Sequence, residues 1–549
     1  MDSDYVDIAA SMSVVDAAGQ YKAFRTEPKR STKKDMGSSL RRKLFLSALG
    51  LSAVLVPTLA VPWFGAVRRK GTRTPSSLPP PYRLPSGFLW GTATAAYQIE
   101  NTQNDDWAVF EKDVLANHRV EQLAPGQAKP GHIHKLSDFP DEVLAKKTDF
   151  DARLEDDLEM AAAMKHNSFR FSISWSRLFP RPDMTDPDPD GIAYYQRLFD
   201  TLDRLRLKPA VTLFHFVSPA WFWQEIAGRR GWERPDALEH FERFVAAVVA
   251  HFGGRAELWC TLNEPMVYVY AGYLDGVFPP LERRGDPKAI VQVTSQLLRA
   301  HALAYRLLKE DAARRGKPVQ VGIAQHVRSF QPLRNHHPLD RLTAQLVEQA
   351  FVWDFLDALH SGVLRSKAMN VEQAIPGLVG TQDYVGLNYY GRFYVKSHVT
   401  RPTKFDVLMH DPQSDEDRPN ELGWASYPEG FRLALLKAHE RYHLPLYVLE
   451  NGTADSKDED TDRQRLLVEH IRELFLAQKA GADIRGYFHW SLFDNFEWAE
   501  GFTARFGLTK IDYQNNFART PRPSAALYTR IIEANGLDAE LLAQHGPWP

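Results

Sequence analysis

The feature that most limits how this chain folds is a regular alternation of short apolar segments with long helical ones. The segments between the apolar runs carry apolar residues at helical spacing, as at Phe150, Leu154, Leu158, Ala161 and Met164. Near-continuously apolar strands that alternate with helices form parallel sheets covered on both faces. Eight such units predict an α/β fold with a single closed (β/α)8 TIM barrel. The predicted strands are 87–92, 169–174, 210–215, 258–263, 319–324, 383–388, 446–450 and 485–490.

An open doubly wound sheet is the alternative architecture for the same alternation. It receives little support, because no Gly-rich phosphate-binding turn follows the first predicted strand. Of the 549 residues, 44% are apolar, which suffices for a large core, and barrels often form one domain at such lengths. The 67 basic and 69 acidic residues leave a net charge of −2, so no long-range field favours nucleic acid as a partner.

The residues before the predicted barrel differ from it in composition. Residues 1–43 form a polar basic tail, 44–67 an uncharged apolar run, and 68–83 a Pro-rich linker. The apolar run is long enough to cross a bilayer of about 30 Å. We interpret it as a transmembrane anchor or an export signal, a poorly ordered extension being the third alternative. We favour the anchor, because the run exceeds the usual core of a signal peptide.

This interpretation makes the membrane a partner through the N-terminal segment. Basic residues are more numerous before the apolar run than after it, which places the main domain on the extracytoplasmic side. We expect the barrel to occupy 84–535 and a C-terminal tail to occupy 536–549. Residues 396–424 are polar, and we expect them to be irregular and to form part of the rim of the barrel.

Polar and aromatic residues stand where most of the predicted strands end. In parallel barrels the strand ends meet at one rim, which is where the active site lies. Glu264 and Glu450 end the fourth and seventh strands, whose tips face each other across the mouth of a barrel. Either glutamate alone is better explained as a helix cap or as the partner of an arginine. Together they supply what cleavage of a glycosidic bond requires, an acid for the leaving oxygen and a second carboxylate at the anomeric carbon.

Several long motifs then give a specific resemblance. The sequences TLNEP (261–265) and VLENG (448–452) resemble the two catalytic motifs of the glycoside hydrolase family 1 β-glycosidases. The stretches FLWGTATAAYQIE (88–100), FRFSISWSRLFP (169–180), GLNYYGRF (386–393) and HWSLFDNFEWAEGFTARFGL (489–508) are similar to further motifs of that family. The resemblance runs from about residue 84 to 535 in this order.

The resemblance implies a retaining double displacement with assigned roles. Glu264 matches the acid/base residue and Glu450 the nucleophile, while the residues that support them are Arg170, Asn263, Asn388 and Tyr390. A nucleophile must be ionised, and we expect Arg170 to lower the pKa of Glu450. We expect burial and the charge of Glu450 to raise the pKa of Glu264, so that it starts protonated.

The same resemblance implies a set of sugar-binding residues and no metal or cofactor. These residues are Gln98, His215, Trp490, Glu497, Trp498 and Phe506. The pair Glu497–Trp498 favours an unphosphorylated glucosyl or galactosyl unit. Two positions depart from the family pattern, Phe216 where tryptophan is usual and Asn101 where glycine is common. These departures affect the expected specificity rather than the expected chemistry.

The function predicted from the sequence is a β-glycosidase acting on a small β-glycoside or a glycolipid. A membrane-associated transglycosylase that moves galactosyl units between glycolipids is an alternative, because 321–332 resembles that branch of the family. An inactive carbohydrate-binding protein is an alternative of another class. The presence of Glu264, Glu450 and Arg170 argues against that last alternative.

Overall fold

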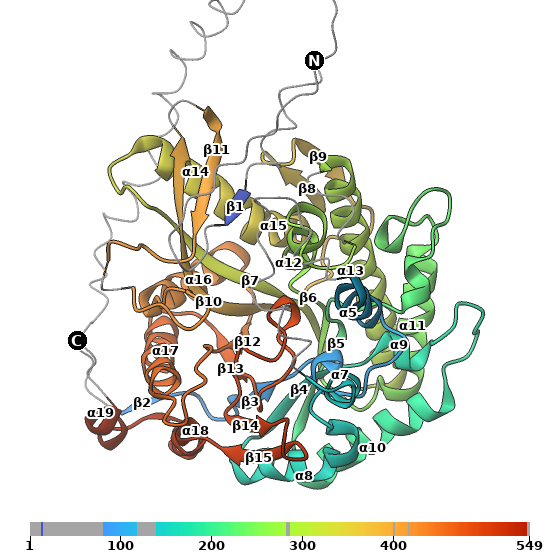
Figure 1. The fold of residues 1–549 in the computed structure, drawn as a ribbon, viewed down its shortest axis with the longest axis horizontal. Helices are drawn as coiled ribbons and strands as arrows, with labels where there is room; N and C mark the ends of the chain where they lie inside the picture. The colour runs from blue at the N-terminus through green and yellow to red at the C-terminus, as the bar shows by residue number, and fades with distance from the viewer. Residues whose placement is uncertain are drawn as a thin grey trace, which may run out of the picture. The chain divides into compact units, whose positions relative to one another are not determined.

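Eight parallel strands close into a barrel in the computed structural model (Figure 1). The structure describes residues 12–14, 81–117, 139–280, 286–398, 401–414 and 417–545. The barrel closes because β13 pairs with β3 and β10 pairs with β7, which confirms the (β/α)8 barrel and excludes the open sheet. Its strands are β3 (Leu89–Ala93), β4 (Ser168–Ser172), β5 (Lys208–Phe214), β6 (Leu258–Asn263), β7 (Gln320–Pro332), β10 (Tyr384–His398), β12 (Leu446–Asn451) and β13 (Ile484–Trp490).

Helices surround the barrel, as Figure 1 shows. Several begin with the signals that helix starts require: Pro189 and Pro287 occupy first turns, and the side chains of Asp188 and Asp286 accept hydrogen bonds from the backbone N–H groups there. The helices are α4 (Ala96–Ile99), α5 (Asp106–Asn117), α7 (Asp141–Lys146), α8 (Phe150–Ala163), α9 (Trp175–Leu178), α10 (Pro189–Leu205), α11 (Ala237–Phe252), α12 (Pro265–Val269), α13 (Pro287–Arg315), α14 (Pro338–Glu348), α15 (Asp354–Ser361), α16 (Pro428–Tyr442), α17 (Thr461–Lys479), α18 (Pro523–Glu533) and α19 (Ala539–His545).

Short strands and turns complete the described chain. The strands are β1 (Met12–Val14), β2 (Tyr82–Arg83), β8 (Val363–Ser366), β9 (Val371–Ala374), β11 (Arg401–Leu408), β14 (Thr509–Asp512), β15 (Ala518–Pro521) and β16 (Gly536–Leu537). The single turns of 3-10 or π helix are η2 (Ala220–Trp223), η3 (Gly231–Glu233), η4 (Tyr270–Leu274), η5 (Gln349–Trp353) and η6 (Trp498–Glu500).

Two of the barrel strands, β7 and β10, are much longer than the sequence predicts. Both continue past the barrel mouth, and β11 folds back on β10 as an antiparallel strand. The expectation of irregular structure over 396–424 is therefore wrong for its first part. The strands approach closely at glycines: a Cβ added to Gly386 would lie 2.4 Å from the carbonyl oxygen of Ile323, and one on Gly322 would lie 2.6 Å from that of Tyr384.

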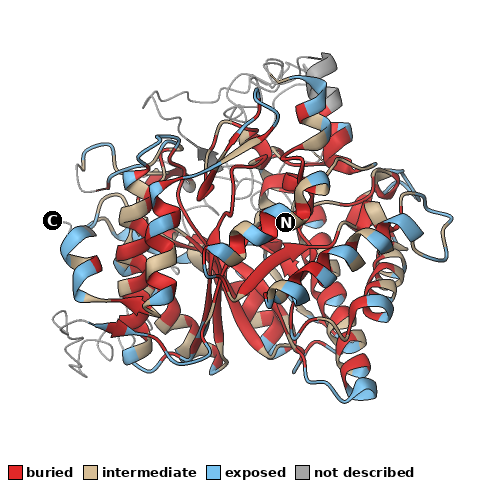
Figure 2. Ribbon diagram, turned by 90° about the horizontal axis from the view of Figure 1, so that it is seen from below, coloured by how far each residue is buried: buried red, intermediate tan, exposed pale blue. Residues whose placement is uncertain are grey.

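The core lies inside the barrel and between the barrel and its helices. Figure 2 shows the central strands buried along their length, with exposed residues on the outer faces of the helices. Among the fully buried side chains are Trp90, Trp259 and Arg170. Arg170 differs from the other two, because an arginine is rarely fully buried unless it has a partner for its charge.

The two ends of the barrel domain are joined through Asn535. Its amide donates to the carbonyl oxygen of Leu84 at 2.7 Å, and its side-chain oxygen accepts from the indole of Trp90 at 2.9 Å. Next to it, β16 pairs with β2 in antiparallel fashion. The start of the barrel domain and the residues that follow α18 are therefore held together by side-chain contacts as well as by the β2–β16 ladder.

The predicted membrane segment, residues 44–67, lies outside the described residues. Within the part of the chain that the structure describes, no helix is long and apolar enough to span a bilayer. The predicted N-terminal tail and linker also fall outside it, apart from β1 and the first residues of the barrel domain. The anchor and the orientation of the domain stay predictions.

Candidate active site

The glutamates predicted from the strand ends meet in one buried cluster at the carboxyl end of the barrel. Glu264 follows β6 directly, and Glu450 lies in β12. Their exposed fractions are 6% and 3%. Two carboxyl groups at this depth require partners, because unpaired buried charge is costly.

Glu450 is held by two donors from two other strands. Arg170, on β4, donates from Nη1 to Oε1 at 2.7 Å. Tyr390, on β10, donates its hydroxyl hydrogen to Oε2 at 2.8 Å. Arg170 also donates to the carbonyl oxygen of Leu449 at 3.0 Å, so the guanidinium is fixed to the backbone as well as to the carboxylate. Each oxygen of Glu450 thus has one donor, which fixes the orientation of the carboxylate.

Glu264 is held at a single oxygen. The amide of Asn388 donates to Oε1 at 2.8 Å, and Nδ1 of His326 lies 2.9 Å from the same oxygen. The backbone of Glu264 is left-handed, with φ 45° and ψ 56°, at the abrupt change from β6 to α12. Glutamate rarely adopts this conformation, and such strain is concentrated at functional sites.

A chain of hydrogen bonds joins the two glutamates. Arg170 donates from Nη2 to the side-chain oxygen of Asn263 at 2.6 Å, and Asn388 donates to that oxygen at 3.1 Å. The nitrogen of Asn263 lies 2.9 Å from Nε2 of His215. All four supporting residues predicted from the sequence, namely Arg170, Asn263, Asn388 and Tyr390, therefore contact one of the glutamates or each other.

The electrostatics of the cluster correct the expected division of protons. Burial raises the pKa of Glu450 to about 7; the charge of Arg170 opposes the rise and that of Glu264 adds to it. Burial also acts to raise the pKa of Glu264, but the charge of His326 in its protonated form and the hydrogen bonds from His326 and Asn388 outweigh it, so that pKa is lowered while His326 is charged. The expected directions were the opposite ones, because the sequence analysis did not weigh the burial of Glu450 and did not include His326 beside Glu264.

The predicted sugar-binding residues line up beside the glutamates. Trp490 donates from its indole to Oε2 of Glu497 at 3.3 Å, and Gln98 lies within 3.5 Å of the same oxygen. The ring of His215 lies 6.0 Å from that of Trp490 and 5.8 Å from that of Trp498. Burial raises the pKa of Glu497 to about 8, opposed by the hydrogen bond from Trp490.

Aromatic rings border the cluster on its other side. Phe506 lies 6.2 Å from the ring of Tyr390 and 6.0 Å from that of Trp424, measured between centroids. Phe216, where the family pattern has tryptophan, packs edge-on against Trp498 at 5.1 Å. An apolar wall here suits the hydrophobic face of a sugar ring or of its substituent.

Two residues near the glutamates escaped the sequence analysis, His326 and Arg328. Both lie on the extension of β7 beyond the predicted strand. A short signal for them exists, because apolar Val327 stands between polar His326 and Arg328, which is the alternation typical of a strand. Placing the end of the strand at Ala324 hid the polar side chains that the extension presents.

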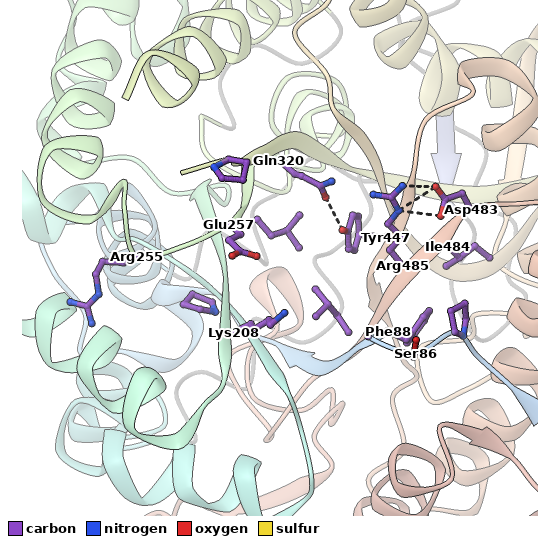
Figure 3. A pocket seen from close by; sticks show the side chains of 16 residues that line it. Ser86, Phe88, Lys208, Arg255, Glu257, Gln320, Tyr447, Asp483, Ile484 and Arg485 are labelled. Carbon is purple, nitrogen blue, oxygen red and sulfur yellow. Dashed lines mark hydrogen bonds and ion pairs between the residues drawn. The ribbon is translucent and has the colours of Figure 1, made fainter. Parts of the chain in front are cut away.

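The cavities of the molecule do not by themselves identify the cluster around Glu264 and Glu450 as the candidate site. A cavity of about 630 Å³ opens at the opposite, amino-terminal end of the strands (Figure 3). Another, of about 460 Å³, borders Tyr390 and Trp424. Among the described residues, no group of three or more His, Cys, Asp or Glu side chains is arranged to hold a metal ion.

The chain is similar to known proteins in both sequence and structure. The family model "Glycosyl hydrolase family 1" matches residues 81–537. A β-galactosidase of Sulfolobus acidocaldarius is 30% identical over 514 residues, covering 83% of this chain and 96% of that protein. The β-glucosidase A of Thermotoga maritima is also 30% identical, over 475 residues, covering 83% and 99%. The solved β-glycosidase of Pyrococcus horikoshii superposes with a TM-score of 0.73 at 34% identity, covering 85% and 99%.

Proposed function

Because the chain belongs to glycosyl hydrolase family 1, and is thus a glycoside hydrolase, we propose that it is a retaining β-glycosidase. Its substrates are terminal non-reducing β-D-glucosyl or β-D-galactosyl residues. The observation that carries the proposal is the pair Glu264 and Glu450, each oriented by its own donors and joined through Asn263.

In the first step the carboxylate of Glu450 attacks the anomeric carbon. The glycosidic C–O bond breaks, and Glu264 gives its proton to the leaving oxygen. Arg170 and Tyr390 hold the attacking carboxylate on its two sides and share its charge before attack. The product of this step is a glycosyl ester of Glu450 and the free aglycone.

In the second step water replaces the aglycone. Glu264, now a carboxylate, takes a proton from the water as the oxygen attacks the anomeric carbon, and the ester bond to Glu450 breaks. The sugar leaves with its original anomeric configuration, because the carbon has been inverted twice. Glu264 ends the cycle protonated and Glu450 ends it ionised.

The sugar unit is recognised beside Gln98, Glu497 and Trp498. Buried polar groups of this kind discriminate strongly, because a sugar that lacks the matching hydroxyl leaves them unpaired. The named relatives are a β-glucosidase and a β-galactosidase, and both sugars enter the proposal for that reason. The relatives named above do not support the glycolipid transglycosylase or the inactive carbohydrate-binding protein. Attachment to a membrane stays a prediction from the sequence.

A panel of aryl β-glycosides, followed by proton NMR of the sugar first released, tests the proposal. We expect hydrolysis of the β-glucoside or the β-galactoside, with the β-anomer appearing before mutarotation. Release of the α-anomer first would contradict retention. Hydrolysis of neither glycoside would contradict the proposed substrate class.

A further inference from the structure

Arg328 is a buried cation with no acidic partner. It is 2% exposed and sits on β7, two residues from His326 on the same face of the strand. Its guanidinium lies 4.0 Å from the ring centroid of Phe393 and 4.5 Å from that of Trp424. Nη1 is buried and unpaired, and within the described chain no carboxylate lies at ion-pair distance from this side chain. Burial lowers the pKa of Arg328 to about 10. A residue so costly to bury calls for a role.

A hydrogen bond from Arg328 to His326 indicates what that role is. Nε of Arg328 donates to Nε2 of His326 at 3.3 Å. An arginine nitrogen has only hydrogen to offer, so Nε2 of the histidine must accept and cannot carry a proton. A neutral imidazole has one N–H, which is then on Nδ1, the nitrogen 2.9 Å from Oε1 of Glu264.

We infer that Arg328 is a positioning residue that keeps His326 neutral with its proton on Nδ1, so that Glu264 accepts at Oε1 and carries its own proton on Oε2. The inference rests on the proposed function, because it concerns the acid of that reaction. Asn388 donates to the same Oε1, whereas Oε2 has no donor among the described residues. The proton that serves the leaving oxygen is thereby confined to one of the two carboxyl oxygens.

The surroundings of His326 leave its ring little freedom to take another role. The ring stacks on Tyr390 at 5.6 Å and 19° and meets Phe351 edge-on at 5.6 Å. A second proton on the imidazole would place a cation against the guanidinium of Arg328. The titratable and charged groups around His326 and its partner Glu264 are Arg328 on β7, Tyr390 on β10, Arg170 on β4, Glu450 on β12 and Glu497 after β13.

A neutral His326 also removes a difficulty of the mechanism. A charged imidazole is the largest influence that lowers the pKa of Glu264 and leaves the proton of the pair on Glu450. The first step requires the reverse arrangement. With the imidazole neutral, its charge no longer lowers the pKa of Glu264; burial, which acts to raise that pKa, is then opposed by the hydrogen bonds from His326 and Asn388 and by the charge of Arg170.

The test compares wild type with Arg328→Met, whose side chain follows the arginine stem and has no donor. The measurement is the ratio of kcat/KM, variant to wild type, from pH 5.5 to 8 with phenyl and 2,4-dinitrophenyl glycosides. Without Arg328, no donor occupies Nε2 of His326 and no neighbouring guanidinium opposes a second proton on the imidazole. We expect a loss of about tenfold at pH 5.5 for the phenyl glycoside, which shrinks to about twofold at pH 8. The dinitrophenol leaving group needs no acid, so its loss is smaller.

A double variant isolates the pathway through His326. Asparagine at 326 offers an N–H near the position of Nδ1 and never ionises. His326→Asn alone is expected to lower kcat/KM by the same factor at every pH. Adding Arg328→Met to it should then produce no new dependence on pH. Arg306→Met, at an exposed position of α13, is the matched control and should follow wild type throughout.

The outcomes separate this inference from the proposed function. A loss in Arg328→Met that is equal at all pH values and for both leaving groups, or that persists in the His326→Asn background, overturns the inference. If Arg328→Met does not fold, as judged by circular dichroism, His326→Asn decides alone: a reshaped pH profile means that the wild-type histidine titrates and overturns the inference. A wild type inactive on both glycosides overturns the proposed function, and this inference with it.

Discussion

The two ends of the barrel carry similar side chains in opposite circumstances. At the amino-terminal end, Asp483 and Arg485 form an ion pair at 2.8 Å in which both side chains are nearly half exposed (Figure 3). At the carboxyl end, Glu450 and Arg170 form one at 2.7 Å, and their side chains alone are 5% and 1% exposed. An exposed pair contributes about 0–1 kcal/mol to stability, whereas breaking a buried pair costs about 3–5 kcal/mol.

The comparison shows that burial of charge, and not the size of a hollow, distinguishes the reactive end. The cavity at the amino-terminal end is roomy, at about 630 Å³, yet its charged groups face solvent and its polar contacts are ordinary. The carboxyl end holds acids with altered pKa values and a glutamate in a left-handed conformation. Substitutions at the two ends should therefore differ greatly in effect.

The largest effect is expected for Glu450→Ala. The substitution removes the nucleophile, and we expect kcat for any aryl β-glycoside to fall by about four orders of magnitude or more. Steady-state hydrolysis with circular dichroism as a check on folding measures it. Normal turnover in the folded variant would show that Glu450 is not the nucleophile.

The next largest effect is expected for Glu264→Ala. Loss of a general acid should reduce kcat/KM for a phenyl glycoside by about 10²–10⁴-fold. The first step with a dinitrophenyl glycoside should be nearly spared, and a rapid burst of dinitrophenol should precede a slow steady state. Equal losses for both leaving groups would argue against proton donation by this residue.

A moderate effect with a defined sign is expected for Tyr390→Phe. The hydroxyl donates to the ionised form of Glu450 and so lowers its pKa. Removing it raises that pKa, so the acidic limb of kcat/KM, which requires Glu450 ionised, moves to higher pH by about half to one unit. A pH profile of the variant beside wild type measures the shift. A limb that stays in place or moves to lower pH contradicts the assignment.

The smallest effect is expected at the other end, for Tyr447→Phe. Its hydroxyl donates to Gln320 at 2.7 Å beside the cavity of Figure 3. We expect the free energy of unfolding to fall by about 1 kcal/mol and kcat/KM to stay within about twofold of wild type. Denaturant unfolding and hydrolysis assays measure the two quantities. A loss of activity as large as that of Tyr390→Phe would remove the contrast between the two ends.

The fold follows closely from local sequence, because eight apolar strands and their helices repeat one pattern. Helix α8 contains Phe150, Leu154, Leu158 and Ala161, four of the positions whose apolar spacing predicts a helix. The carboxyl-terminal ends of β7 and β10 were not predicted, because each predicted strand ended where its apolar run ended. Beyond that point strand pairing with β11 and across β7–β10 maintains the extension, and such pairing is not visible in a single segment.

The sequence predicts which residues form the candidate site better than it predicts the pKa values of its two glutamates. Glu264, Glu450 and Arg170 stand at strand positions that a barrel brings to one rim, so their meeting follows from topology. The pKa of Glu264 depends on His326, which belongs to a different strand and lies 62 residues away. A pKa that depends on contacts between distant segments cannot be predicted without the three-dimensional structure. The expected direction of the pKa shift of Glu264 was wrong for that reason.

The contacts of Asn535 have a consequence for circular permutation of the chain. They hold the start of β3 and the end of α18 in one place, on either side of the seam between the first and last strands. A circular permutant that joins residues 81 and 537 by a short linker and opens a surface loop elsewhere would make that seam covalent. The barrel would keep its strand order, and the contacts of Asn535 would no longer be needed to hold the two segments together.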